Sequence, residues 1–176
     1  MPPNAYRPGD RADFDCLYRE TYSRIRFTLQ GMLRDGPSAE DCAQETFEKA
    51  FRAWPTWKGD APAEAWLHRI AVNVAISRHR SERVREMGET IRRLGRPSHA
   101  ASADAGLDLL DALRRLPPRE SAVIVLRHHH GYSNREIAFA LGAPESTVAS
   151  RLAAAKRHLF EMLGESVTVE LRRSPR

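Results

Sequence analysis

The sequence has few cysteines and no long apolar run, and each shortage excludes a class of protein. Two cysteines, Cys16 and Cys42, are too few for a disulfide framework or a four-thiolate metal site in a chain of 176 residues. No apolar stretch could span a membrane, and no signal-peptide pattern follows the first residues. We therefore expect a soluble, cytoplasmic protein. Buried, unreactive thiols are the simpler expectation for the two cysteines, and a redox pair is the alternative.

Lysine is also scarce, because it supplies 3 of the 28 basic residues and arginine supplies the other 25. The guanidinium group suits phosphate and carboxylate oxygens, so this bias is compatible with a nucleic-acid partner. A GC-rich coding sequence would produce the same bias. The formal net charge is +5, and 176 residues fit one domain or two small ones. Composition alone therefore decides neither the kind of partner nor the number of domains.

Signatures of catalysis are absent from the sequence. It has no Ser-His-Asp or Cys-His arrangement, glycine-rich phosphate loop or metal-spaced acidic cluster, so an enzyme is not favoured and no cofactor is expected. The adjacent histidines 128–130 would point about 100° apart on a helix, and cannot converge on one metal ion without a ligand from elsewhere. We expect them at a partly exposed helix C-terminus, with no metal site.

Apolar residues recur every three or four positions, which predicts an all-α fold. Ser38 stands three residues before Asp41 and is expected to cap the second helix in a capping box. The predicted first half consists of a mobile tail over 1–13 and a helical domain over 14–87, with helices over about 14–33, 38–53 and from 63 onward.

The apolar period fails between residues 88 and 106, which predicts a flexible linker. A second helical domain is predicted over 107–163, followed by a tail over 164–176. The apolar run 123–126 follows Pro117-Pro118 within a segment of helical period, so we expect helix there and not a buried strand. The whole is predicted as two small helical domains.

Residues 133–158 carry the strongest local signal. Ser133 and Glu136 form a second capping box, Gly142 permits a tight turn, and Pro144 stands at the start of the next helix. This order predicts a helix-turn-helix, whose second helix can enter a DNA major groove. A helical hairpin in an ordinary bundle is the alternative. The residues expected toward DNA are Arg135, Glu145, Ser146, Thr147, Ala149, Ser150, Arg151, Lys156 and Arg157.

Charge is distributed unevenly along the first domain. Residues 78–97 contain seven arginines and three glutamates, a net charge of +4. Such a run is either a solvated helix face or a surface that follows phosphates, and Trp57 and Trp66 add rings that can stack on unpaired bases. The second helix instead has an acidic face, which either confers solubility or meets a basic protein partner. That face contains Asp41, Gln44, Glu45 and Glu48.

Three motifs in this order resemble the extracytoplasmic-function (ECF) sigma factors of bacterial RNA polymerase. The sequence Asp-Cys-Ala-Gln-Glu-Thr-Phe at 41–47 is similar to that family's polymerase-binding helix. Residues 57–60 and 66–73 resemble the segment with which that family melts and reads the minus-ten promoter element. Leu-Pro-Pro-Arg-Glu at 116–120, together with the helix-turn-helix, resembles the part that reads the minus-thirty-five element. The resemblance covers about residues 14–86 and 107–163.

The resemblance implies a role for each surface. Asp41, Gln44, Glu45, Phe47 and Glu48 would bind the coiled coil of the largest polymerase subunit. The second domain would meet the minus-thirty-five element and the flap of the second-largest subunit, and an anti-sigma factor is a further partner to consider. Asn73 would help hold a flipped base during melting. The minus-ten set would be Trp57, Lys58, Trp66, Arg69, Asn73, Arg78 and Arg80.

The sequence therefore favours a non-catalytic sigma factor that binds core polymerase and directs promoter recognition and DNA melting. The rival hypothesis is a stand-alone helix-turn-helix regulator that binds duplex DNA as a dimer. The acidic face of the second helix and the segment 57–73 distinguish the two, because a simple repressor needs neither.

Overall fold

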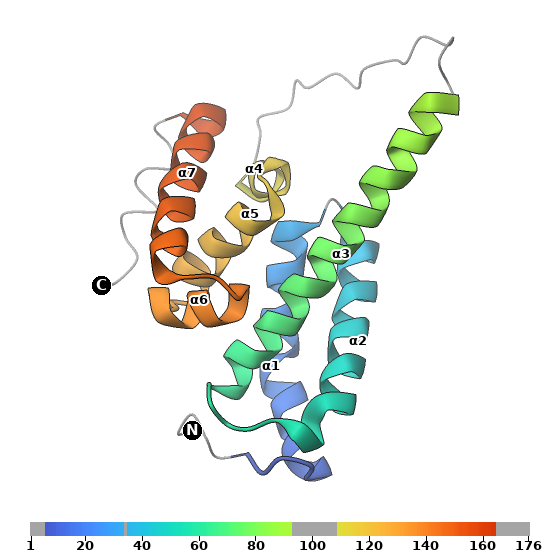
Figure 1. Cartoon of the computed structure of the whole chain (residues 1–176), viewed down its shortest axis with the longest axis vertical. Helices are drawn as coiled ribbons and strands as arrows, with labels where there is room; N and C mark the ends of the chain where they lie inside the picture. The colour runs from blue at the N-terminus through green and yellow to red at the C-terminus, as the bar shows by residue number, and fades with distance from the viewer. Residues whose placement is uncertain (1–5, 34, 93–108, 165–176) are drawn as a thin grey trace.

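The structure, a computed structural model, describes residues 6–33, 35–92 and 109–164, without the side chains of 86–92. Every regular element in these ranges is helical, which confirms the all-α fold (Figure 1). Residues 1–5, residues 93–106 of the predicted linker and residues 165–176 of the predicted tail lie outside the described part. The elements are α1 (Arg11–Met32), α2 (Gly36–Ala53), η1 (Trp54–Thr56), α3 (Ala63–Arg92), α4 (Leu109–Arg115), α5 (Pro118–Ile124), the π-helical turn η2 (Val125–His129), α6 (Asn134–Leu141) and α7 (Glu145–Leu163).

The first helix begins earlier than its apolar period predicts. The side chain of Asp10 accepts a hydrogen bond from the backbone N–H of Asp13, so α1 starts at Arg11 and not near Phe14. The carbonyl of Asp10 in turn accepts from the indole nitrogen of Trp54 at 2.8 Å. Residues just before α1, which we expected in a mobile tail, are therefore tied to the end of α2.

The predicted capping box at Ser38 is wrong. The cap of α2 is Asp35, whose Oδ1 accepts from the backbone N–H of Ser38 at 2.6 Å. The helix therefore begins at Gly36, with Pro37 in its first turn, where a missing N–H costs nothing. Ser38 is buried inside this first turn. Two residues suited to capping stood close together in the sequence, and the upstream one starts the helix.

The third helix is the longest element. It starts at Ala63 as predicted and continues to Arg92, past residue 87, where we expected the linker to begin. A helix of 30 residues is about 45 Å long.

The two halves of the chain pack against each other. In Figure 1, α4–α7 lie along one side of the bundle formed by α1, α2 and α3. Helix α6 contacts α3, and both α4 and α5 contact α1. At Gly31 an added Cβ would lie 3.0 Å from Cγ2 of Val125, so the absence of a side chain allows α1 and α5 to cross closely. The Ser121 hydroxyl reinforces this crossing by donating to the Gly31 carbonyl at 2.6 Å.

Candidate polymerase and nucleic-acid surfaces

The acidic face predicted on α2 is exposed as a continuous surface. Asp41, Gln44, Glu45 and Glu48 all lie on the solvent side of the helix. Glu45 and Glu48 pair with basic residues one turn away on α2, and such exposed pairs stabilise little, so these carboxylates stay available to a partner. The face thus combines negative charge with a rigid helix.

Phe47, the fifth residue of the predicted polymerase-binding set, is placed differently. Its ring is 5% exposed and lies 4.7 Å from Tyr18 and 5.7 Å from Tyr22, between ring centroids. It therefore fixes α2 against α1 and presents little surface to a partner.

The aromatic residues of the predicted minus-ten set form a cluster. Trp57 is 5% exposed and stacks on Trp54 at 5.1 Å, with planes 11° apart. Trp66 is half-buried and lies 6.2 Å from Trp57. Base stacking on Trp57 would therefore require its loop to move, whereas part of Trp66 is already accessible.

The polar members of the minus-ten set lie mainly on the outside. Lys58, Arg69, Asn73 and Arg80 are exposed, and all except Lys58 belong to α3. Arg78 is instead half-buried and pairs with Glu82 at 3.2 Å. These groups place positive charge and amide donors along α3. Beyond them, Arg83 of α3 and Arg114 and Arg115 of α4 help to line a cleft of about 800 Å³ that also reaches the start of α5.

The helix-turn-helix forms as predicted. The Ser133–Glu136 capping box is present at the start of α6, and Gly142 adopts the left-handed conformation with φ 57°. Pro144 is the residue just before α7. Val148, fully buried, fixes α7 against the domain core. The opposite side of α7 is exposed within the part of the chain that the structure describes.

Most of the predicted minus-thirty-five residues lie on that outer side. Thr147 and Arg151 are half-buried, and the Nη1 atom of Arg151 is buried without a hydrogen-bond partner among the described residues. Burial and the nearby Arg119 guanidinium lower the pKa of Arg151. The exposed members are Arg135, Glu145, Ser146, Ala149, Ser150, Lys156 and Arg157.

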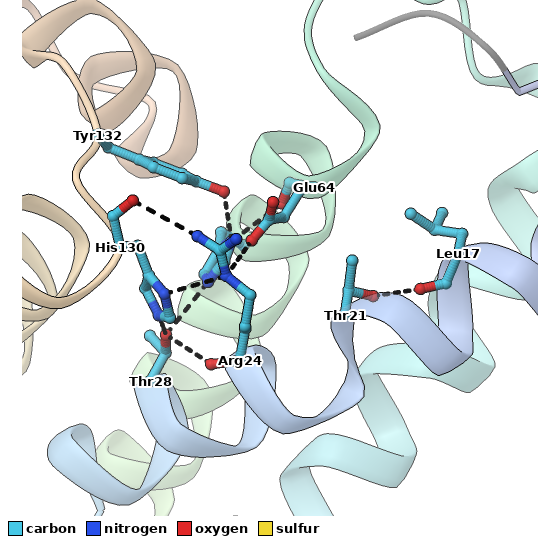
Figure 2. Close-up of polar contacts among 8 residues, drawn as sticks. Leu17, Thr21, Arg24, Thr28, Glu64, His130 and Tyr132 are labelled. Carbon is cyan, nitrogen blue, oxygen red and sulfur yellow. Dashed lines mark hydrogen bonds and ion pairs between the residues drawn. The ribbon is translucent and has the colours of Figure 1, made fainter. Parts of the chain in front are cut away.

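A partly buried polar cluster between the two halves was not predicted from the sequence. We call it the interface cluster (Figure 2). The hydroxyl of Thr28 lies 3.1 Å from Nε2 of His68 and 2.8 Å from Nε2 of His130, so one side chain of α1 joins a histidine of α3 to a histidine that follows η2. The cluster consists of Arg24, Thr28, Glu64, His68, His130 and Tyr132.

The π-helical turn explains how His130 reaches this position. The backbone N–H of His130 bonds to the carbonyl of Val125, five residues earlier, which widens the turn. His129 stacks on Phe27 at 3.8 Å, while the imidazole of His130 reaches Thr28. We expected the histidine run at a partly exposed helix end, whereas the last of the three is part of an interdomain contact.

Three members of the interface cluster have metal-ligating side chains. Ligand atoms of Glu64, His68 and His130 lie within 4.8 Å of one another. Nε of Arg24, however, is 2.7 Å from Oε1 of Glu64 and 3.3 Å from Nδ1 of His130. The guanidinium forms an ion pair with the Glu64 carboxylate and contacts the His130 imidazole, so a protein cation already lies beside two of the three potential ligands.

Comparison with known proteins decides the family. Residues 17–85 match the family Sigma-70 region 2, and residues 106–159 match Sigma-70, region 4. The chain is 31% identical over 160 residues to the ECF RNA polymerase sigma factor SigM of Mycobacterium tuberculosis, covering 91% of this chain and 82% of that protein. The chain belongs to the ECF sigma factor family. It is also 40% identical over 160 residues to SigL of the same species, covering 85% of this chain and 88% of that protein.

The fold agrees with the family. The sigma factor RpoE of Bartonella quintana, solved in complex with the anti-sigma factor NepR, superposes with a TM-score of 0.70 at 26% identity, covering 88% of this chain and 98% of that one. As an alternative sigma factor the chain directs promoter recognition in transcription initiation, and the stand-alone regulator is not favoured. Among the described helices, none has the length and apolarity to cross a membrane. Below, region 2 means α1–α3 and region 4 means α4–α7.

Proposed function

We propose that this ECF sigma factor binds core polymerase through the acidic face of α2 and reads the promoter with two separate surfaces. The exposed polar residues of α3, with Trp66, take up the minus-ten element. The outer side of α7 reads the minus-thirty-five element. The factor itself performs no catalytic step, because recognition and capture of single-stranded bases are sufficient to favour melting.

The observation that carries this proposal is the separation of charge in region 2. The exposed residues Asp41, Gln44 and Glu45 lie on α2, whereas Arg69 and Arg80 lie on α3. Acidic groups repel DNA and attract a basic protein surface, and the arginines do the reverse. One small bundle thus offers a protein-binding face and a DNA-binding face on different helices.

Region 4 supplies the second DNA surface. Ser146, Ala149 and Ser150 are small and exposed near the start of α7, so that helix can approach base edges closely. Lys156 and Arg157 follow further along and are suited to phosphates. We also propose that region 4 contacts the flap of the second-largest polymerase subunit. RpoE was solved in complex with an anti-sigma factor, and we propose that an anti-sigma factor regulates the free form of this chain as well.

Charge reversal tests the partner face. We expect Asp41→Lys combined with Glu45→Lys to weaken binding to purified core polymerase by at least about 100-fold, because several charge contacts at one interface become repulsive. The measurement is competition with a labelled wild-type factor for limiting core. A matched control reverses two exposed carboxylates elsewhere, Asp15→Lys with Glu161→Lys, and should compete like the wild type. Equal competition by both double variants would disprove the assignment of the α2 face.

A further inference from the structure

The residues just before α1 pack against the tryptophan that ends α2. We call residues 6–10 the strap. At one end of the strap, the carbonyl of Asp10 accepts a hydrogen bond from the indole nitrogen of Trp54 at 2.8 Å. At the other end, the ring of Tyr6 meets the ring of Trp54 edge-on, with 6.4 Å between the centroids. The side chain of Trp54 is 1% exposed, so the strap helps to enclose it.

The backbone of the strap has a defined course between α1 and η1. Gly9 has a φ of 80°, and an added Cβ there would lie 3.7 Å from Cα of Pro55. The backbone N–H of Arg7 donates to Oδ2 of Asp13, in the first turn of α1, at 2.7 Å. The strap is therefore attached to α1 and lies beside the end of α2 and the start of the following loop (Figure 1).

Trp54 connects the strap to the minus-ten surface through two further tryptophans. Its ring stacks on Trp57 at 5.1 Å, and Trp57 lies 6.2 Å from Trp66. The rings of Trp54 and Trp66 are themselves 6.0 Å apart. These three residues form a tryptophan stack that leads from the buried side of the strap to the partly accessible ring of Trp66. Because interiors are closely packed, a shift of one ring displaces the next.

The loop 57–62 depends on the tryptophan stack for its position. Within the described part of the chain, residues 58–61 take part in no hydrogen bond or ion pair. The loop is therefore held at its two ends, by the buried ring of Trp57 and by the start of α3. Lys58, a member of the minus-ten set, directly follows Trp57. Its position is consequently determined by how the Trp57 ring packs.

We propose that the strap is a positioning segment of the minus-ten surface. It holds Trp54 and, through the tryptophan stack, fixes the loop 57–62 and the ring of Trp66 in the arrangement that captures unpaired minus-ten bases. A surface that is ordered before its ligand arrives loses less conformational freedom on binding, and it binds more tightly and more selectively. The inference rests on the proposed function, because that function assigns the minus-ten element to this surface.

The first measurement is acrylamide quenching of tryptophan fluorescence in the free, full-length chain. The protein has three tryptophans, and all of them belong to the tryptophan stack. Tyr6→Ala removes the ring that packs on Trp54, whereas the matched control Tyr6→Phe keeps that ring and loses only the hydroxyl that donates to Glu20. We expect the quenching constant to rise by about 2-fold in Tyr6→Ala, because the stack opens locally more often, and to stay at the wild-type value in Tyr6→Phe.

A pair of glycine variants tests the backbone of the strap in the same assay. Gly9→Ala places a side chain at a φ of 80° and strains the strap. The control Gly164→Ala strains an exposed glycine with a φ of 66° at the end of α7, where no atom lies within 4 Å of an added Cβ. Quenching should increase in Gly9→Ala and not in Gly164→Ala.

The second measurement is transcription from a library of promoter sequences by core polymerase that carries each variant. Tyr6→Ala and Gly9→Ala should reduce the preference for the best minus-ten sequence over single-base mismatches by about 5-fold, because the base-contacting groups are displaced. Minus-thirty-five preference, competition for core polymerase and helical content by circular dichroism should remain at the wild-type values. A purely structural role would lower both promoter preferences together.

Three results would overturn the positioning role: wild-type quenching in Tyr6→Ala and Gly9→Ala, an unchanged minus-ten preference, or an equal fall in both promoter preferences. A wild-type holoenzyme without factor-dependent start sites would refute the proposed function instead. The quenching assay contains neither polymerase nor DNA, so it reports on the link between the strap and the tryptophan stack independently, and the two failures are distinguishable.

Discussion

At the scale of single residues, buried polar side chains determine how the two regions meet. Thr28 and His68 occupy positions that continue the apolar stripes of α1 and α3, and both are 0% exposed. A polar residue in an apolar stripe is the one signal by which the sequence could have indicated the cluster. The partners lie 40 and 102 positions away from Thr28, so their identity depended on the tertiary structure.

The histidines of the cluster predict a pH dependence. Burial lowers the pKa of His68 to about 4, from about 6.5 in the unfolded chain. Folding therefore favours the neutral ring, and this stability is complete above pH 6.5 and is lost as the pH falls toward 4. The groups that face His68 are Thr28, Arg24, Glu64, His130 and Tyr132. We expect the free energy of unfolding to fall by up to about 1.4 kcal/mol per pH unit in this range from His68 alone.

Denaturant unfolding at pH 7.5 and pH 5.5 measures this effect. Burial also lowers the pKa of His130, to about 3, so its contribution has the same sign. The pKa of Glu64 is raised by burial, and its contribution opposes theirs as the pH falls. The variant His68→Gln cannot titrate and should show a shallower loss. If the free energy of unfolding depended on pH equally in this variant and in the wild type, the assignment of the effect to His68 would be contradicted.

At the scale of elements, the sequence predicted correctly where a helix begins or ends when only one nearby residue was suited to that position. The box at Ser133 and the turn at Gly142 were confirmed because a complete set of local hydrogen bonds is encoded within a few residues. The cap of α2 was misplaced because Asp35 and Ser38 compete for the same helix start. The π-helical turn η2 has no comparable local signal, since it depends on how region 4 packs against α1.

Glycine substitutions test the turn of the helix-turn-helix. Gly142→Ala forces a side chain into the left-handed conformation and should lower the free energy of unfolding by about 1–2 kcal/mol. Gly36→Ala is the control, because Gly36 lies in the first turn of α2 with no atom within 4 Å of an added Cβ. Its effect should be neutral or stabilising by up to about 1 kcal/mol. Urea unfolding of both variants provides the comparison, and an equal loss in both would exclude the turn as the cause.

At the scale of the whole molecule, the sequence indicated two helical domains and an uneven distribution of charge along the first of them, and the structure adds the contact between the two. Periodicity predicts which face of a helix is buried, but it does not say whether a neighbour in the same region or in the other region buries it. The close crossing at Gly31 illustrates this, because the atoms nearest to an added Cβ belong to region 4, with Cγ2 of Val125 the nearest at 3.0 Å. Likewise, the exposure of Gln44 followed from the helical period, whereas the burial of Trp57 did not.

The most direct test of the central claim is transcription by purified core polymerase supplied with this factor and a library of promoter sequences. Sequencing of the transcripts should reveal new start sites that share a minus-ten and a minus-thirty-five sequence at constant spacing. Substitutions on the outer side of α7 should alter the second sequence only. An absence of factor-dependent start sites, together with tight binding of the free factor to duplex DNA, would contradict the account and favour the stand-alone regulator.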